Sequence, residues 1–231
     1  MSITQSIILA GGLGTRLRSV VSDLPKCMAP VNGRPFLAYV VDHLKKEGID
    51  KFIFSVGYKH KAILAFVNKE YSKSGIDFSV EEEPLGTGGA IKLACKKSNE
   101  KNVLVVNGDT LFKIKLKQLD FFHNKINADC TLSLKPMQNF DRYGVVELAA
   151  DSSITDFKEK QHYKDGLING GVYALNVQSL LQEKLTDKFS FEKDYLEKFV
   201  NQRRFFGVIQ DEYFIDIGIP EDYQRAEIEF K

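Results

Sequence analysis

The sequence has few cysteines and no excess of charge of either sign, and each shortage excludes a class of protein. Cys27, Cys95 and Cys130 lie far apart and form no Cys-x-x-Cys pair. We therefore expect a reducing compartment, and neither a disulfide framework nor a structural zinc site. The 32 Lys and Arg residues balance 31 Asp and Glu residues, for a formal net charge of +1. Because nucleic acids and anionic membranes attract basic proteins, we expect neither as a partner.

Long apolar runs are also missing. The first run, residues 7–10, ends at two glycines and is too short for a signal peptide. No stretch approaches the roughly 20 apolar residues of a membrane-spanning helix, so we expect a cytoplasmic protein. Hydrophobic residues make up 43% of the 231 residues and charged residues 27%. This composition is typical of a folded domain large enough to hold a substrate cleft.

Short apolar runs alternate with helical patterns in the first half of the chain. This alternation predicts an α/β fold with a parallel sheet covered on both faces. After about residue 128 the β-type segments become more frequent, which predicts an addition to the same sheet. The expected strands are at 6–10, 52–56, 76–80, 103–106, 131–134, 145–148 and 171–175, and the expected helices at 36–44, 63–67, 90–97, 177–185, 191–200 and 221–229.

A glycine-rich turn follows the first predicted strand. Ligands of open α/β sheets bind at the carboxyl ends of the strands. Gly11, Gly12 and Gly14 bring bare N–H groups against an anion, and Arg16 supplies a planar fork for phosphate oxygens. Leu17 stands where a dinucleotide fingerprint has its third glycine, and no Walker-type Gly-Lys-Ser/Thr occurs. The turn therefore predicts a phosphate site of another kind.

Lys26 lies between Pro25 and Pro30, whose rings restrict the backbone around it. Its position shortly after the glycine-rich turn predicts a charge that neutralises phosphate, although a solvated surface lysine is the alternative. A second glycine-rich segment, residues 81–90, permits close approach of a flat ring, and Thr87 adds a hydroxyl. A flexible loop before a helix is the alternative for that segment.

Two carboxylates follow short apolar runs. Asp109 ends the segment 107–109 and Asp216 lies shortly before Pro220. Carboxylates at strand ends beside a phosphate loop suit a hard divalent cation, which predicts a site for such an ion. A turn-forming role for Asp109 and a helix-capping role for Asp216 are the alternatives.

Seven segments, in this order, resemble the sugar-phosphate nucleotidyltransferases: 11–17, 25–30, 85–90, 107–109, 159–160, 169–171 and 216–220. The resemblance covers nearly the whole chain. It implies a three-layer, Rossmann-like α/β fold with a mixed, mainly parallel sheet. Because no break in composition marks a second domain, we expect one domain, 1–231, with a nucleotide-binding part at about 1–127 and a sugar-binding part at about 128–231. The implied reaction joins a nucleoside triphosphate and a sugar 1-phosphate into a nucleoside-diphosphate sugar and pyrophosphate.

The resemblance also implies roles for individual residues. The catalytic set is Arg16, Lys26, Asp109 and Asp216, of which the two aspartates hold Mg²⁺. The nucleotide-binding set is Leu9, Ala10, Gly11, Gly12, Gly14, Thr15, Arg16, Glu83, Pro84, Leu85, Gly86, Thr87, Gly88, Asn107 and Gly108. The sugar-phosphate set is Tyr143, Gly144, Glu159, Lys160, Asn169 and Gly171.

The residues at 83–90, 140–144, 166–171 and 213–218 are similar to those of guanylyltransferases that act on D-glycero-α-D-manno-heptose 1-phosphate and supply cell-surface polysaccharides. We therefore predict GTP and this heptose as substrates. Mannose-1-phosphate guanylyltransferases and hexose-1-phosphate uridylyl- or thymidylyltransferases are the alternatives within the family. A catalytically silent nucleotide-sugar-binding subunit and an NAD-dependent enzyme are alternatives from other classes, and a homo-oligomer is compatible with the sequence.

Overall fold

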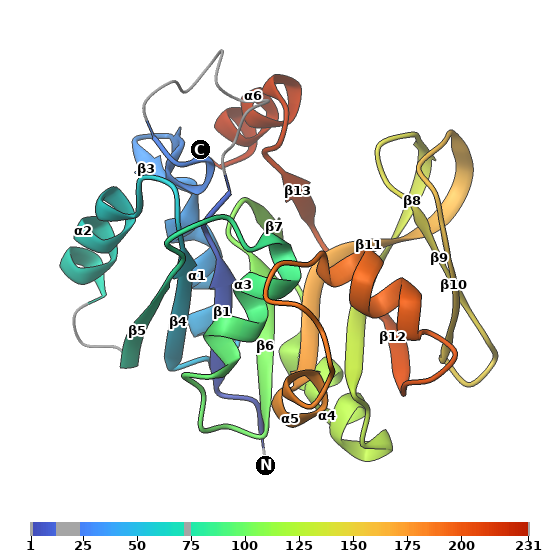
Figure 1. Cartoon of the computed structure of the whole chain (residues 1–231). Coiled ribbons are helices and arrows are strands. Elements are labelled where there is room, and N and C mark those ends of the chain that lie inside the picture. Colours follow the sequence, from blue (N-terminus) through green and yellow to red (C-terminus); the bar gives the residue numbers. More distant parts are fainter. Residues whose placement is uncertain (1, 13–23, 72–74, 231) are drawn as a thin grey trace.

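A mixed sheet runs through the computed structural model, which describes residues 2–12, 24–71 and 75–230. Within these residues, nine strands form the sheet, and seven of them follow the order β10-β9-β11-β6-β1-β4-β5 (Figure 1). The nine strands are β1 (Gln5–Leu9), β4 (Lys51–Val56), β5 (Gly75–Val80), β6 (Asn102–Asn107), β8 (Cys130–Phe140), β9 (Val145–Leu148), β10 (Ile154–Lys158), β11 (Tyr163–Asn176) and β12 (Phe205–Ile209).

The sheet changes character at β6. Strands β6, β1, β4 and β5 pair in parallel. Strand β11 then pairs antiparallel with both β6 and β8, whereas β12 pairs in parallel with β8. Two short ladders lie outside the sheet, β2 (Pro30–Val31) with β3 (Arg34–Pro35) and β7 (Thr110–Phe112) with β13 (Phe214–Asp216).

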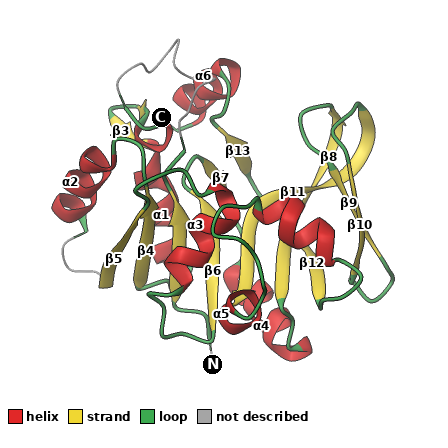
Figure 2. Ribbon diagram, in the orientation of Figure 1, coloured by secondary structure: helices red, strands yellow, loops and turns green. Residues whose placement is uncertain are grey.

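Helices cover both faces of the sheet, which gives three layers (Figure 2). One face packs against α1 (Phe36–Lys46), α2 (His60–Glu70), α4 (Leu116–Ile126) and α6 (Pro220–Glu229). The other packs against α3 (Gly86–Cys95), α5 (Val177–Leu181) and a π-helix (Phe191–Glu197). Neighbouring strand residues such as Ile7 and Ile8 enter opposite cores, because strand side chains alternate between faces. None of the described helices is long and apolar enough to cross a bilayer.

The predicted fold class is confirmed, and most predicted elements are present. Helix α1 follows Pro35 and ends before Gly48, whose φ of +103° is unfavourable for other residues. Helix α4 and strands β2, β3, β7, β10, β12 and β13 were not predicted. The sheet continues from β6 into β11, and the boundary near residues 127–128 stays a prediction.

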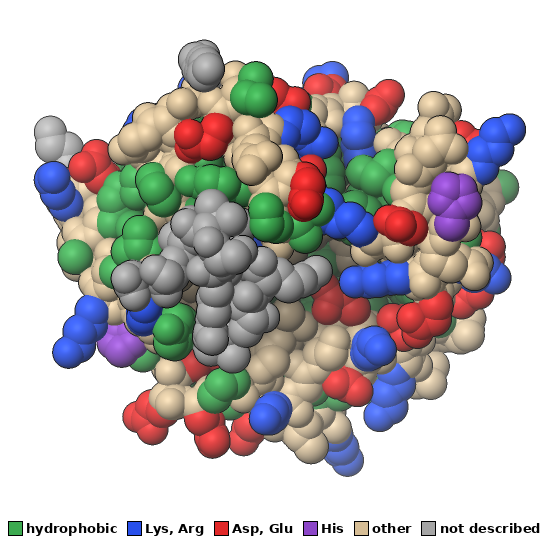
Figure 3. Space-filling view, turned by 90° about the horizontal axis from the view of Figure 1, so that it is seen from above, with side chains coloured by type: hydrophobic (Ala, Val, Ile, Leu, Met, Phe, Trp, Pro, Cys, Tyr) green, Lys and Arg blue, Asp and Glu red, His purple; other side chains and the backbone are tan. Residues whose placement is uncertain are grey.

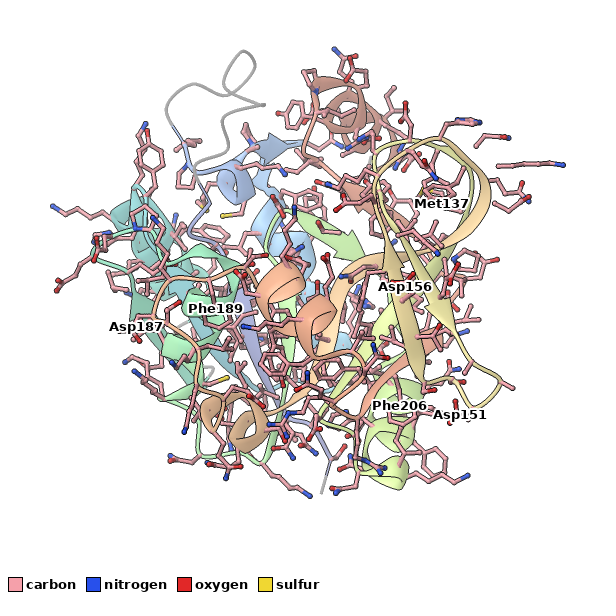
Figure 4. All side chains as sticks on the ribbon, turned by 45° about the vertical axis from the view of Figure 1, so that its right-hand side comes forward. Met137, Asp151, Asp156, Asp187, Phe189 and Phe206 are labelled. Atoms are coloured by element: carbon pink, nitrogen blue, oxygen red, sulfur yellow. The ribbon has the colours of Figure 1, made fainter. Side chains whose placement is uncertain are left out.

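Helix α3 begins at Gly86, four residues earlier than the predicted start at residue 90. Gly88 and Gly89 lie within it despite the low helix propensity of glycine. A Cβ on Gly88 would come within 2.1 Å of the Phe189 ring, and one on Gly89 within 2.1 Å of the Asp187 carbonyl oxygen. Figure 4 labels Asp187 and Phe189, which lie on the segment that passes beside α3. Close packing therefore explains these glycines, and residues 86–90 form a helix N-terminus, as the alternative for this segment partly expected.

Candidate active site

The strand order reverses beside β1, because β4 and β5 lie on one side of it and β6 on the other. Such a reversal leaves a crevice at the carboxyl ends of the strands. Residues after β1 and residues after β6 meet there, and the Gly108 N–H donates to the Leu9 carbonyl at 2.9 Å. A Cβ on Gly108 would lie 2.9 Å from the same oxygen, so this close approach requires glycine.

Lys26, Asp109 and Asp216 come together beside this crevice, and we call them the lysine–aspartate cluster. The Lys26 Nζ lies 2.5 Å from Asp109 Oδ2 and 3.2 Å from Asp216 Oδ1. The antiparallel ladder of β7 and β13 pairs Thr110 with Asp216, which brings Asp216 next to Asp109. Three distant segments thus supply one compact group of charges.

Lys26 is held by local structure. It begins a 3₁₀ helix, Lys26–Met28, in which Cys27 and Met28 are buried. Burial lowers the pKa of Lys26, but the carboxylates of Asp109 and Asp216 more than offset this effect, so its pKa lies above the ordinary value. The ammonium therefore stays charged at neutral pH, and the alternative of a solvated surface lysine is wrong.

Asp216 does not cap helix α6. The N-cap residue is Ile219, which makes no side-chain cap hydrogen bond. Asp216 Oδ1 instead accepts a hydrogen bond from the Gly218 N–H at 2.8 Å. Its second oxygen, Oδ2, lies 3.9 Å from the Arg142 guanidinium. The carboxylate is therefore fixed in orientation and turned toward charged groups.

The two aspartates fit a divalent cation. Both lie within hydrogen-bond distance of one ammonium, which shows that a single positive charge can satisfy them together. Carboxylate oxygens suit Mg²⁺, which binds few protein groups and takes its remaining ligands from phosphate and water. Among the described residues, no three His, Cys, Asp or Glu side chains gather as a metal site.

A cavity of about 810 Å³ extends from the cluster along the strand ends, and we call it the strand-end cavity. Eleven predicted site residues line it. They are Leu9, Ala10, Gly11, Gly12, Lys26, Glu83, Pro84, Gly86, Thr87, Asn107 and Asp109. Acidic and basic side chains are interspersed on the face seen from above (Figure 3). Gly14, Thr15 and Arg16 lie outside the described residues, and their predicted roles stay predictions.

Glu81, to which the sequence reasoning gave no individual role, lies in the wall of this cavity. Its Oε2 accepts a hydrogen bond from the Leu85 N–H at 3.0 Å. Its Oε1 lies 2.9 Å from the place where a Cβ on Gly11 would be. Burial raises the pKa of Glu81, although the Leu85 N–H and the Ser55 hydroxyl oppose this. Its position directly after β5 is the signal that points to it.

Two predicted sugar-side residues, Asn169 and Gly171, lie on β11, and Gly171 packs against Asn107 at the end of β6. A Cβ on Gly171, whose φ is +70°, would lie 2.5 Å from Asn107 Nδ2. The Asn169 amide is oriented from both ends, because its Oδ1 accepts from the Gly171 N–H at 3.0 Å and its Nδ2 donates to the Tyr173 hydroxyl at 2.9 Å. The structure thus fixes the Asn169 amide on β11 and places Gly171 beside Asn107, which lines the strand-end cavity.

The other predicted sugar-side residues are more spread out. Tyr143 packs edge-on against Phe214 of β13, with ring centroids 5.9 Å apart. Burial raises the pKa of Tyr143. Gly144 packs against the chain at Lys158, where a Cβ would lie 2.3 Å from the carbonyl oxygen. Glu159 and Lys160 follow β10 and are exposed.

Arg142 is a second residue that the sequence reasoning passed over. Its guanidinium pairs with Asp222 of α6 and approaches Asp216. It therefore ties the segment before Tyr143 to the C-terminal helix and to the lysine–aspartate cluster. Charged residues before a Tyr-Gly pair carry no clear sequence signal, which explains the omission.

Three known proteins are similar to this chain over nearly all of its length. The D-glycero-alpha-D-manno-heptose 1-phosphate guanylyltransferase of Aneurinibacillus thermoaerophilus is 52% identical over 98% of each chain. The protein of the same name from Campylobacter jejuni is 46% identical over 95% of this chain and 96% of its own. The crystal structure of HddC from Yersinia pseudotuberculosis complexed with GMP-PN has a TM-score of 0.89 and 40% identity, over 99% of this chain and all of that one.

The family comparison agrees with the geometry. Residues 5–230 match the nucleotidyl transferase family. This range contains the lysine–aspartate cluster and the whole lining of the strand-end cavity. The chain therefore belongs to the nucleotidyl transferase family.

Proposed function

We propose that the chain transfers GMP from GTP to D-glycero-α-D-manno-heptose 1-phosphate, which yields GDP-heptose and pyrophosphate. The lysine–aspartate cluster at one end of the strand-end cavity carries the proposal. Two relatives bear the name of this activity, at 52% and 46% identity. The HddC structure, complexed with GMP-PN, supports a guanine nucleotide.

The chemistry needs charge neutralisation more than proton transfer. The phosphate of the sugar substrate is already an anionic nucleophile, and its oxygen attacks the α-phosphorus in line with the departing pyrophosphate. Two anions must approach each other for this step. Lys26, charged and partly buried, is placed to offset the repulsion and to stabilise charge on the α-phosphate. Arg16 and the glycine-rich turn are proposed to do the same for the triphosphate.

Asp109 and Asp216 are the residues proposed to hold Mg²⁺. When bound, the ion would supply further positive charge to the phosphate oxygens. The aspartates themselves are fixed by the β7–β13 ladder and by the Gly218 N–H. Asp109 lines the strand-end cavity. This arrangement supports a metal site that nucleotide and protein complete together.

Glu81 supports guanine as the base. Guanine presents two neighbouring N–H donors on its pairing edge, and one carboxylate accepts both. Uracil and thymine present a single N–H between two carbonyl oxygens, which a carboxylate repels. Glu81 lies in the wall of the strand-end cavity, and the Leu85 N–H uses only part of the acceptor capacity of its carboxylate. We propose that Glu81 selects GTP.

A panel of substrates tests the proposal. The protein is incubated with Mg²⁺, each of GTP, ATP, UTP, CTP and dTTP, and each of heptose, mannose and glucose 1-phosphate, and released pyrophosphate is measured. GTP with the heptose is expected to give the highest kcat/KM. Equal or better turnover of UTP with glucose 1-phosphate would contradict the assignment. No turnover with any pair, together with saturable binding of GDP-sugar, would favour the silent binding subunit.

A further inference from the structure

A chain of hydrogen bonds joins the two substrate sides of the molecule through a residue outside the predicted site. Glu192 lies on the π-helix, between the buried residues Phe191 and Tyr195. Its Oε2 accepts from the Thr87 hydroxyl at 3.3 Å, and its Oε1 accepts from the Tyr173 hydroxyl at 3.4 Å. Tyr173 in turn accepts from the Asn169 amide at 2.9 Å.

The four residues form a continuous series, and we call Thr87, Glu192, Tyr173 and Asn169 the Glu192 network. At one end, Thr87 lies in the first turn of α3 and lines the strand-end cavity. At the other, Asn169 belongs to the predicted sugar-side set. Tyr173 is only 2% exposed, so its hydroxyl depends on these partners.

Within this network, the Thr87 and Tyr173 hydroxyls both donate to Glu192, and Asn169 donates to Tyr173. The Thr87 hydroxyl accepts from the Phe191 N–H at 2.9 Å, so its own hydrogen is free to go to Glu192. The Tyr173 hydroxyl accepts from Asn169, so its hydrogen also goes to Glu192. A carboxylate, which only accepts, satisfies both donors at once. An amide in its place would meet one hydroxyl with an N–H.

This polarity has a consequence for both substrates. Thr87 lines the strand-end cavity beside Gly86, whereas the Asn169 amide, in the predicted sugar-side set, is held by Gly171 and Tyr173. Ordering either end restrains the carboxylate of Glu192 and, through it, the other end. Two binding events that order a shared set of groups favour each other.

We propose that Glu192 is a positioning residue that couples the nucleotide side to the sugar side, so that each substrate tightens the binding of the other. The proposal rests on the proposed function, because it takes Thr87 to lie on the nucleotide side and Asn169 on the sugar side. A coupling of this kind is reciprocal, so the same factor applies to both substrates.

Calorimetry tests the coupling directly. The binding of α,β-methylene-GTP, which resists transfer, is measured with Mg²⁺ in the presence and absence of saturating heptose 1-phosphate, and the reverse titration is also made. In the native protein each ligand is expected to tighten the other about fivefold or more. In Glu192→Ala, Thr87→Val and Tyr173→Phe the factor is expected to fall to within about twofold of one.

Matched variants separate coupling from general damage. Thr87→Ser keeps the hydroxyl and is expected to keep the native factor. Glu100→Gln changes a glutamate that pairs with Lys51 at the start of β4. This variant is also expected to keep the native coupling factor. Thr87→Val and Tyr173→Phe probe the network from its two ends even if Glu192→Ala does not fold.

The outcomes are distinguishable from failure of the proposed function. A native protein that turns over GTP and heptose 1-phosphate but shows no coupling would overturn the network proposal alone. So would variants whose separate affinities fall while the coupling factor stays native, because that pattern indicates a purely structural role. A native protein without turnover of any substrate pair would instead overturn the proposed function.

Discussion

The parallel and antiparallel halves of the sheet build their sides of the site differently. Most residues that wall the strand-end cavity lie at or just after the ends of β1, β4, β5 and β6, and Gly11, Gly12 and Gly57 are among them. On the antiparallel side, Asn169 is oriented by side-chain and backbone hydrogen bonds, and Tyr143 and Gly144 are positioned by contacts with β13 and with the segment after β10.

This difference follows from topology. Parallel strands all end at the same edge, so residues after them converge without special contacts. Antiparallel strands end at opposite edges, so their functional groups need dedicated partners to be held in place. The lysine–aspartate cluster lies where the two halves meet, because β7 follows β6 and its partner β13 comes from the C-terminal part.

The largest effect on turnover is expected in the lysine–aspartate cluster, where the two halves of the sheet meet. Asp109→Asn removes one of the two carboxylate charges and should lower kcat with GTP and heptose 1-phosphate about 1,000-fold. The fold should remain, since Asp109 is partly exposed and the amide keeps its size. Steady-state kinetics and a thermal melt check both parts. Asp77→Asn, at an exposed ion pair with Lys97, is the control, and equal turnover of the two variants would contradict a role for Asp109.

A change confined to the parallel half should alter only the selection of the nucleotide. Glu81→Gln replaces one acceptor oxygen by a donor, so it should lower the preference for GTP over UTP about 10- to 100-fold, in line with the loss of one buried, charge-assisted hydrogen bond. The KM for heptose 1-phosphate should stay within about twofold. Competition assays with both nucleotides measure the ratio. An unchanged GTP preference would remove Glu81 from base selection.

A change confined to the antiparallel half should alter only the binding of the sugar phosphate. Gly144→Ala places a Cβ 2.3 Å from the Lys158 carbonyl oxygen, so the backbone must shift there. The KM for heptose 1-phosphate should rise about tenfold while the KM for GTP is unchanged. Kinetics with each substrate varied in turn give both values. Equal rises in the two constants would mean that the halves are not separable in this way.

The smallest effect on turnover is expected away from both sides. His123 is buried, its Nδ1 lies 2.9 Å from the Thr131 hydroxyl, and burial lowers its pKa to about 4. Between pH 6.5 and 4 the unfolded chain binds a proton that the folded chain does not, so stability falls as the pH falls. His123 should contribute about 2–3 kcal/mol to this loss.

His123→Asn keeps a polar group near Thr131 but cannot take up this proton. Urea unfolding between pH 7 and pH 4 should therefore show a shallower loss of stability in the variant than in the native protein. Turnover at pH 7.5 should be the same in both. If the stability of the variant and of the native protein falls equally between pH 7 and pH 4, His123 does not titrate as described.

The parallel half of the fold was predictable because its signals are local. Apolar runs, Pro35 and Gly48 predict strands and a helix from neighbouring residues alone. Glu81 directly follows β5, which is also a local signal. The early start of α3 was not predictable, because its glycines pack against Phe189 and Asp187, about 100 residues later in the chain.

The long-range parts of the site required the structure. Lys26 and the two aspartates were selected from the sequence by their motifs, but only the β7–β13 ladder explains why Asp216 lies beside Asp109. The Glu192 network depends on how the π-helix packs beside α3 and β11. Thr87 and Asn169 belong to predicted motifs, but Tyr173 and Glu192 belong to none, so no sequence pattern marks the link between them.

A crystal structure with Mn²⁺, α,β-methylene-GTP and heptose 1-phosphate tests the central claim most directly. The account predicts anomalous density for one ion within about 2.0–2.6 Å of oxygens from both Asp109 and Asp216, with Lys26 moved from between them toward phosphate. Metal and triphosphate bound elsewhere, with Lys26 still paired to both aspartates, would contradict it.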